Sequence, residues 1–335
     1  MDLSTADPDT VLDTLDRRLV CALQVDGRAE PGRIAEVLGV SARTVTRRLA
    51  RMQQAGVLRV VRLPDVEDSA VGALLLRVRV LRGAVDAIAQ ALADRPDVPF
   101  VDVMLGGHEV GAVMLSDAGA RDRLLYGQLP ATAAVTETTT HAVLHAFADA
   151  GQWQAGYLSA PEAAALARPH VPRPAAPPPL DGLDRALLAR LSENARQSHA
   201  ALAAAVGAPE STVRRRLHRL DEAGQLRTHA TVDPQLLGMA VDANLWLDVP
   251  PGRLAEVGTA LAGHPLVHGV FATSGPHNLL AVVFCADHGG LYRFLTDTLG
   301  PLGVTRAETT ITARAVKRAG VPLRRPGAGA RPPRA

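Results

Sequence analysis

The sequence predicts an α+β protein that contains two winged helix-turn-helix domains and two ferredoxin-like βαββαβ domains, arranged as an internal duplication. Residues 15–59 align without a gap with residues 183–227, and 18 of the 45 pairs are identical. Further along, Gly106-Gly107-His108 recurs as Gly275-Pro276-His277. A proline-rich stretch over 169–180 separates the two copies. Self-similarity on this scale indicates that the chain contains two copies of one unit, and that each unit has two parts.

These features predict the borders of the domains. We expect a flexible tail over 1–10, a winged helix-turn-helix over 11–66, an α+β domain over 70–150, a proline-rich linker over 151–180, a second winged helix-turn-helix over 181–234, a second α+β domain over 239–320 and a disordered tail over 321–335. Prolines cannot continue a helix or a central strand, so the linker is expected to be extended and semi-rigid.

The composition excludes several classes of protein. The chain has 335 residues, a net charge of +2 and 47% hydrophobic residues, which allows ordinary globular cores. Its only cysteines, Cys21 and Cys285, are too few for a disulfide framework. Charged residues interrupt every long apolar run, and the N-terminal residues do not resemble a signal peptide, so we expect a soluble, cytoplasmic protein without membrane contact. Dinucleotide and Walker-type glycine motifs are absent from the sequence, and no cofactor is predicted.

The beginning of each copy has the pattern of a helix-turn-helix. Asp13 or Thr14 can cap a first helix that runs to about Val25. Pro31 suits the first turn of a second helix, and Gly39 suits the tight turn that ends it. A third helix is predicted over 42–54, with Ser41 as its cap and Gly56 after its end, and a strand or wing over 57–63. Two helices joined by a short glycine turn are the signature of this motif.

The third helix has one apolar and one basic face. Helical periodicity places Val45, Leu49 and Met52 toward the core. The segment 41–62 carries six arginines and no acidic residue, which favours contact with the phosphates and bases of double-stranded DNA. The residues predicted to bind DNA are Ser41, Arg43, Thr44, Thr46, Arg47, Arg48 and Arg51 in the first copy, and Ser211, Thr212, Arg214, Arg215, Arg216 and Arg219 in the second. Glu210, Asp221 and Glu222 dilute the charge of the second copy.

The second part of each copy alternates strand and helix patterns in the order β-α-β-β-α-β, which is typical of a ferredoxin-like unit. The predicted elements are 74–80, 85–92, 99–105, 110–116, 121–129 and 135–146, and then 243–249, 254–261, 267–274, 279–286, 291–299 and 304–316. Within the last strands, Glu137-Thr138-Thr139 matches Glu308-Thr309-Thr310. Because such a sheet is covered by helices on one face only, we expect the two sheets to pair within the chain.

The chain resembles the Lrp/AsnC family of transcription regulators. The resemblance rests on Leu-Asp-Arg-Arg-Leu-Val at 15–20, Asp-Gly-Arg at 26–28, the segment from Ser41 to Leu58 and the two glycine turns, and it covers about 15–147 and 183–318. It implies an amino acid or related small metabolite as effector, pairing of the α+β domains and further oligomers. It also implies effector binding near Gly106, Gly107, His108, Glu109, Gly275, His277 and Asn278, although Glu109 and Asn278 replace the acid usual in the family.

The sequence contains features of two other functions, a metal site and a sirohaem decarboxylase. His141 and His145 could form a metal pair, but the second copy does not repeat them, so no metal site is predicted. His108 and His277 are present in both copies and are interpreted either as hydrogen-bonded turn residues or as donors to an effector carboxylate. Sirohaem decarboxylases share the fused two-part unit and are the alternative, but 101–115 and 270–284 lack the arginine and tyrosine expected of their pockets. We therefore predict a regulator that is not an enzyme.

Overall fold

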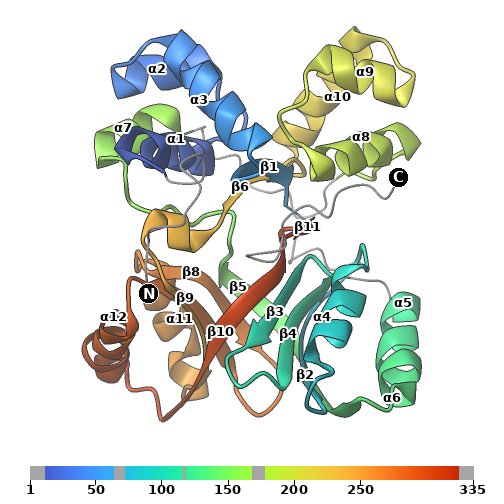
Figure 1. Ribbon diagram of the computed structural model, residues 1–335, viewed down its shortest axis with the longest axis vertical. Coiled ribbons are helices and arrows are strands. Elements are labelled where there is room, and N and C mark those ends of the chain that lie inside the picture. The colour runs from blue at the N-terminus through green and yellow to red at the C-terminus, as the bar shows by residue number, and fades with distance from the viewer. Residues whose placement is uncertain (1–11, 64–71, 116–117, 168–177, 324–335) are drawn as a thin grey trace, which may run out of the picture.

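The computed structural model describes residues 12–63, 72–115, 118–167 and 178–323. Two helical heads lie side by side above a large β structure whose outer side carries helices (Figure 1). The first head consists of α1 (Thr14–Val25), α2 (Pro31–Leu38), α3 (Ala42–Gln54) and β1 (Leu58–Arg62). The second consists of α8 (Gly182–Glu193), α9 (His199–Val206), α10 (Glu210–Glu222) and β6 (Thr228–Val232). The predicted duplication of the helix-turn-helix is confirmed.

The helix ends are fixed by the residues that the sequence indicated. The Asp13 carboxylate accepts a hydrogen bond from the amide of Asp16, and the amide of Asp13 donates one to the Asp16 carboxylate, which makes a reciprocal cap at the start of α1. Gly39 ends α2 with a φ of 68°, a left-handed conformation that favours glycine. Ser41 caps α3 through the amide of Thr44. The turn between α2 and α3 is therefore set by local chemistry.

The two heads are joined through their wing strands. β1 and β6 form a two-stranded antiparallel sheet, with Leu58 opposite Val232 and Arg62 opposite Thr228. Each wing thus pairs with the wing of the other head. Because Ala230 and Val232 also belong to the core of the first head, the heads share one packed unit.

The beginning of the predicted linker packs on the first head. Helix α7 (Ala160–Leu166) follows Ser159, which caps it, and buries Leu166 completely. Glu162 of α7 forms an ion pair with Arg18 of α1. The predicted tail over 1–10 and most of the prolines of the predicted linker lie outside the described residues.

The lower part of the molecule contains two sets of strands and helices in the same order. The first set is β2 (Ala73–Val80), α4 (Val85–Ala93), β3 (Phe100–Met104), β4 (Glu109–Leu115), α5 (Ala118–Asp122), η2 (Arg123–Gln128), α6 (Leu129–Ala131) and β5 (Val135–Ala148). The second set is β7 (Val241–Asp248), α11 (Leu254–Ala262), β8 (Val267–Thr273), β9 (Leu279–Cys285), α12 (His288–Arg293), η5 (Phe294–Leu299), η6 (Gly300–Leu302) and β10 (Arg306–Arg318). Two short 3-10 turns, η3 (Pro234–Leu237) and η4 (Pro251–Arg253), flank β7. Each set has its own core beneath α4 or α11.

All strands of both sets belong to one sheet, in the order β11-β10-β3-β4-β2-β5-β8-β9-β7, and β10 also pairs with β7. Two long strands make this closure possible. The first part of β10 pairs with β7 and its last part with β3, while β5 pairs first with β2 and then with β8. The two sets therefore exchange strand edges, and the side chains of facing strands enclose an interior.

The strand register corrects one match made in the sequence. Arg77 and Trp246 are counterparts at the 169-residue spacing of the two glycine turns, and they lie opposite Thr139 and Glu308 respectively. The structural counterpart of Glu308 is therefore Thr139 and not Glu137. The similarity of the two Glu-Thr-Thr triplets was misleading because a shift of two residues keeps every side chain on the same face of a strand.

Two further predictions need adjustment. The helix expected over 121–129 is divided into α5, the π-helical η2 and α6, and Pro130 stands in the first turn of α6. Val321–Pro322, placed in the disordered tail, forms the short strand β11 beside β10. Ala319 and Gly320 both have positive φ values, 48° and 80°, and make the tight turn that reverses the chain. The remainder of that tail, 324–335, lies outside the described residues.

Candidate nucleic-acid interface and effector site

The predicted DNA-binding arginines fall into two groups. Arg43 and Arg47 of α3 and Arg215 of α10 are exposed, and within the described part of the chain they have neither a hydrogen bond nor an ion pair. Their guanidinium groups are available to a ligand. Thr46, also exposed, donates its hydroxyl to the carbonyl of Ala42 in the preceding turn.

The second group holds each head together. Arg48 and Arg51 reach from α3 to α1 and contact opposite oxygens of Asp16, at 3.0 and 2.5 Å. Arg48 also contacts Asp13 at 2.6 Å, which holds the pKa of Arg48 above its usual value through hydrogen bonds to both carboxylates. Asp16 is 1% exposed, so this ion pair crosses the interior of the head.

The second head repeats the arrangement. Arg216 lies 3.4 Å from Asp184 and 2.7 Å from Asp181, and Arg219 contacts Asp184 directly. Asp184 is fully buried. Arg48, Arg51, Arg216 and Arg219 are also predicted to contact DNA, and the structure shows that each of them binds a carboxylate within its own head. Helical periodicity could not reveal this, because the partner carboxylate lies on another helix.

The two recognition helices present different faces. On α10, Arg214 pairs with Glu210 at 3.1 Å and His218 lies 3.1 Å from Glu222. Serine at 211 replaces Arg43, and Pro209 caps α10 without a side-chain hydrogen bond, whereas Ser41 caps α3. The first head therefore offers more unpaired positive charge than the second.

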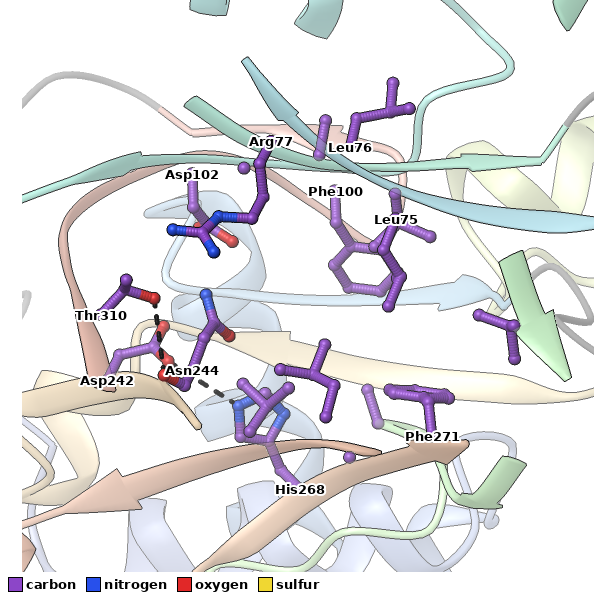
Figure 2. Close-up of a pocket in the computed structure, with 18 of the residues that line it drawn as sticks. Leu75, Leu76, Arg77, Phe100, Asp102, Asp242, Asn244, His268, Phe271 and Thr310 are labelled. Carbon is purple, nitrogen blue, oxygen red and sulfur yellow. Dashed lines mark hydrogen bonds and ion pairs between the residues drawn. The ribbon is translucent and has the colours of Figure 1, made fainter. Parts of the chain in front are cut away.

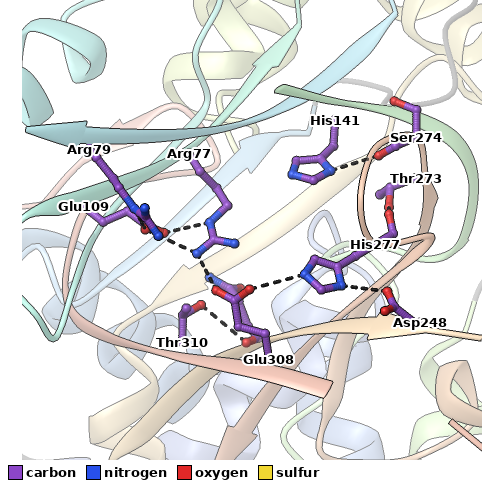
Figure 3. Close-up of polar contacts among 11 residues, drawn as sticks. Arg77, Arg79, Glu109, His141, Asp248, Thr273, Ser274, His277, Glu308 and Thr310 are labelled. Atoms are coloured by element: carbon purple, nitrogen blue, oxygen red, sulfur yellow. Dashed lines mark hydrogen bonds and ion pairs between the residues drawn. The ribbon is translucent and has the colours of Figure 1, made fainter. Parts of the chain in front are cut away.

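The first glycine turn ends at a buried carboxylate. Glu109 begins β4, is 7% exposed and receives hydrogen bonds from Arg77 at 2.8 Å and from Arg79 at 3.4 Å (Figure 3). Arg79 also binds Glu137 at 2.9 Å and remains half exposed. Glu109, predicted to bind an effector, is thus neutralised by two arginines from the neighbouring strand β2.

The second glycine turn places His277 between two acids. Its Nδ1 lies 2.8 Å from Asp248, and its Nε2 lies 3.3 Å from Glu308 of β10. Glu308 also accepts a hydrogen bond from Arg77 at 2.6 Å, and the Arg77 contact holds the pKa of Glu308 below its usual value. Arg77 therefore bridges the two sets of strands, and we name Arg77, Arg79, Glu109, His277 and Glu308 the ion-pair cluster.

The other predicted turn residues have different surroundings. His108 is exposed, and its Nδ1 is 2.9 Å from the carbonyl of Gly106, whereas its counterpart His277 is 4% exposed. Asn278 binds both backbone groups of Val249, at 2.9 and 2.7 Å. Gly107 and Gly275 have φ values of 67° and 100°, and a Cβ on Gly275 would approach His141 to 2.7 Å. The two turns are equivalent in sequence but not in chemistry.

Sequence reasoning assigned no site role to Arg77 or Glu308, and it considered His141 only as part of a metal pair. His141 is fully buried, shares a hydrogen bond with the carbonyl of Ser274 and packs on Trp246 at 4.5 Å between ring centroids. Burial lowers its pKa. Arg77 could have been noticed as one of two charges, with Arg79, in a strand whose other residues are apolar, but its partner Glu308 lies 231 positions away. Among the described residues, no group of three or more histidines, cysteines or acids could hold a metal ion.

Comparisons with known proteins identify the parts of the chain. The AsnC-type helix-turn-helix domain matches residues 12–53 and again 180–221, and the Lrp/AsnC ligand binding domain matches 242–322. An uncharacterized HTH-type transcriptional regulator of Pyrococcus horikoshii is 32% identical over 134 residues, covering 39% of this chain and 85% of the relative. The HTH-type transcriptional regulator Ptr1 of Methanocaldococcus jannaschii is 31% identical over 140 residues, covering 41% and 95%.

The whole fused arrangement is also known from a solved structure. The siroheme decarboxylase NirDL matches 91% of this chain and 93% of its own, with a TM-score of 0.60 and 13% identity. This likeness concerns the fold. It nevertheless contradicts the prediction that the chain is not an enzyme, because a solved enzyme has the same fused architecture. No helix among the described residues is long and apolar enough to cross a membrane.

Proposed function

The chain belongs to the Lrp/AsnC family of transcriptional regulators, and from this premise we propose that it binds double-stranded DNA in the cytoplasm through α3 and α10. The observation that supports this most directly is that the arginines of these helices fall into a paired group and an exposed, unpaired group. Those facing inward pair with Asp16 and Asp184, whereas Arg43, Arg47 and Arg215 are exposed without partners in the described chain. An unpaired guanidinium on a recognition helix suits guanine edges and phosphates.

The test is a binding titration with DNA from upstream of the chain's own gene. Arg47→Ala is expected to weaken binding about tenfold or more, since one good base contact is worth about 1–3 kcal/mol. Arg253→Ala is the matched control, because Arg253 lies next to α11 and pairs with the exposed Glu256. Equal affinity of the Arg47→Ala variant and the unaltered chain would count against this interface.

The proposed regulator responds to an amino acid or a related small metabolite. The ion-pair cluster supports this class because it combines guanidinium and carboxylate groups, which are the partners that a zwitterion requires. Arg79 is the accessible member, with a side chain that is 49% exposed, whereas Arg77 and Glu109 are largely buried. We therefore assign the effector carboxylate to Arg79, beside the turn of Gly106, Gly107 and His108.

A panel of amino acids tested by thermal shift on the full chain checks this assignment. A true effector raises the melting temperature as its concentration rises, because it binds only the folded state. Arg79→Gln removes the charge at the predicted contact and should abolish the shift, while Arg121→Gln, at an exposed pair with Asp122, should retain it. A shift that survives Arg79→Gln would place the effector elsewhere.

We further propose that the two sets of strands are separate ferredoxin-like domains, over 70–150 and 239–320, that pair within one chain and substitute for a dimer. The repeated element order and the exchanged edges of β5 and β10 support this proposal. Larger homo-oligomers are compatible with it. Sedimentation of the purified protein should show that the smallest species is a single chain with both sets folded. Mass photometry should reveal any larger assembly.

Siroheme decarboxylation is the second candidate, and the likeness to NirDL over 91% of the chain is the observation that favours it. The relatives at 31 and 32% identity favour regulation. Incubation with sirohaem, followed by gel filtration and absorption spectroscopy, separates the two. Co-elution of a tetrapyrrole spectrum and loss of carboxylate from it would favour the enzyme.

A further inference from the structure

A cavity lies between the facing strands of the two sets, and Arg77 and Glu109 of the ion-pair cluster form part of its wall. Its volume is about 110 Å³, and Figure 2 shows side chains from both sets directed into it. Most of its wall is apolar, formed by Leu75, Phe100, Val113, Trp246, Phe271 and Leu280. One part of the wall is charged and comes from four strands, with Asp102 on β3, Asp242 on β7, His268 on β8 and Arg318 on β10.

The charges of these four side chains do not cancel. Arg318 contacts Asp242 directly and lies 3.6 Å from Asp102. The one guanidinium thus serves two carboxylates. His268 lies 3.8 Å from Asp242, stacks on Phe284 and has its pKa lowered by burial, so it is neutral near pH 7. When both carboxylates are ionised, these four side chains carry one uncompensated negative charge.

Asp102 is the carboxylate whose charge is least compensated. Its Oδ1 accepts no hydrogen bond within the described chain. Burial raises the pKa of Asp102 to about 7, and the neighbouring Asp242 acts in the same direction, while Arg318 opposes both. A buried acceptor without a donor is unfavourable unless a partner is supplied. The side chain is 19% exposed, and the cavity is the space that it faces.

We propose that this cavity binds a small organic cation, a primary ammonium on a short branched alkyl chain, with Asp102 as its counter-ion. The ammonium would provide the missing positive charge and a donor for Oδ1, and the apolar wall would take the alkyl group. Anions are disfavoured because the carboxylates of Asp102 and Asp242 outnumber the single guanidinium of Arg318 in the charged wall. An engineered cavity of about 150 Å³ holds benzene, so a ligand of about five non-hydrogen atoms fits this one.

The site differs from the one assigned to the effector carboxylate, because Arg79 does not line the cavity. It also has a route to the heads. A second, smaller cavity of about 40 Å³ shares Phe100, His268 and Arg318 with the first and reaches His229–Val232 of the wing strand β6. A ligand on Asp102 would therefore touch the wall that supports a wing. The binding proposal does not depend on DNA binding, so its test uses the ligand alone.

Isothermal titration of the full chain with isobutylamine at pH 7, in buffers of different ionisation enthalpy, tests the proposal. Isobutanol and isobutyrate have nearly the same shape and serve as neutral and anionic probes. We expect the amine to bind at least tenfold more tightly than either. Because Asp102 must ionise to pair with the ammonium, amine binding at pH 7 should be accompanied by release of protons.

Two variants and a control complete the design. Asp102→Asn keeps the shape of the side chain and should weaken amine binding at least tenfold and abolish proton release. Val113→Leu narrows the cavity without a change of charge and should also weaken binding. Asp122→Asn, on the exposed surface of α5, should bind as the unaltered chain does. Equal binding of the alcohol and the amine, undiminished binding by Asp102→Asn, or no amine binding up to about 10 mM would each overturn the proposal.

Discussion

Arg28 and Arg196 each donate a hydrogen bond to the backbone carbonyl of the residue that precedes the other. Arg28 binds the carbonyl of Ala195, and Arg196 binds the carbonyl of Gly27 at 2.8 Å. The two arginines are identical partners in the sequence repeat, so the contact is reciprocal, as in the interface of a two-fold dimer. Arg196 binds the carbonyl of Ala29 as well, at 3.1 and 3.2 Å.

Removal of Arg196 should therefore loosen the junction between the heads. We expect Arg196→Ala to lower the free energy of unfolding by about 1–3 kcal/mol, because three charge-assisted hydrogen bonds to the carbonyls of Gly27 and Ala29 are lost. Urea denaturation followed by circular dichroism measures this. Arg190→Ala is the control, since Arg190 forms only an exposed pair with Glu193 and should change stability by less than about 0.5 kcal/mol. Equal effects of the two variants would show that the reciprocal contact is energetically unimportant.

The two recognition helices should differ in salt dependence. The segment 41–62 carries six arginines and no acid, whereas Arg214 on α10 is already paired with Glu210. Neutralising Arg43 and Arg47 should reduce the slope of log affinity against log salt by about 2, and neutralising Arg214 and Arg215 by about 1. Fluorescence anisotropy at several salt concentrations gives both slopes. If the slopes fall equally, the charge asymmetry of the heads has no role in binding.

The half-sites of the operator should also differ. Position 43 is arginine in the first head and its counterpart at 211 is serine, and position 50 is alanine where 218 is histidine. Two different recognition surfaces on one duplex favour an imperfect palindrome, with half-site centres separated by one helical turn, ~34–36 Å, or a multiple of it. Footprinting of a selected operator measures this. A perfectly symmetric footprint would contradict the prediction.

The buried carboxylates Asp16 and Asp184 should be essential to the stability of their heads. Asp16→Ala leaves Arg48 and Arg51 without their shared partner, and breaking such a pair costs about 3–5 kcal/mol. Asp184→Ala should have a similar effect on the second head, through Arg216 and Arg219. Thermal denaturation detects both, and the exposed Asp122→Ala serves for comparison. A change below about 1 kcal/mol would mean that water or another group replaces the carboxylate.

The stability of the chain should depend on pH through Asp102. Burial raises the pKa of this carboxyl from 3.8 to about 7, so the folded chain holds a proton that the unfolded chain releases. Its contribution is present at low pH and is lost as the pH rises from about 4 to 7. Relative to Asp102→Asn, the unaltered chain should lose on the order of 4 kcal/mol over this interval. Chemical denaturation of both proteins at several pH values tests the sign, and a difference that does not vary with pH would contradict it.

Local signals were sufficient to predict the helices of the heads. Asp13, Gly39 and Ser41 act within one helical turn of their own position, and the structure uses them as caps or turns. The wing pairing between β1 and β6 could not be read locally, because the partner strand is about 170 residues away. The contacts of Arg48 and Arg51 with Asp16 could not be predicted either, because Asp16 lies on another helix.

The glycine turns illustrate a second limit. Sequence similarity placed His108 and His277 in the same role, yet one is exposed and the other is buried between Asp248 and Glu308. The difference arises from the facing strands, and Glu308 contacts His277 because β10 runs alongside β7. Periodicity indicates which face of a strand a residue occupies, but it does not identify the residue that this side chain contacts on the facing strand.

Arg77 and Trp246 occupy equivalent positions in the two copies, and they touch each other, with the guanidinium carbon 5.4 Å from the centre of the indole ring. Two identical subunits could not make this contact, because each residue near their symmetry axis would meet itself, arginine against arginine or tryptophan against tryptophan. Joining the copies in one gene allows each side of the seam to mutate alone. The guanidinium of Arg77 can then pack on the indole ring of Trp246, where a symmetric dimer would place two arginines or two tryptophans against each other. Each copy can therefore acquire its own substitutions at this contact.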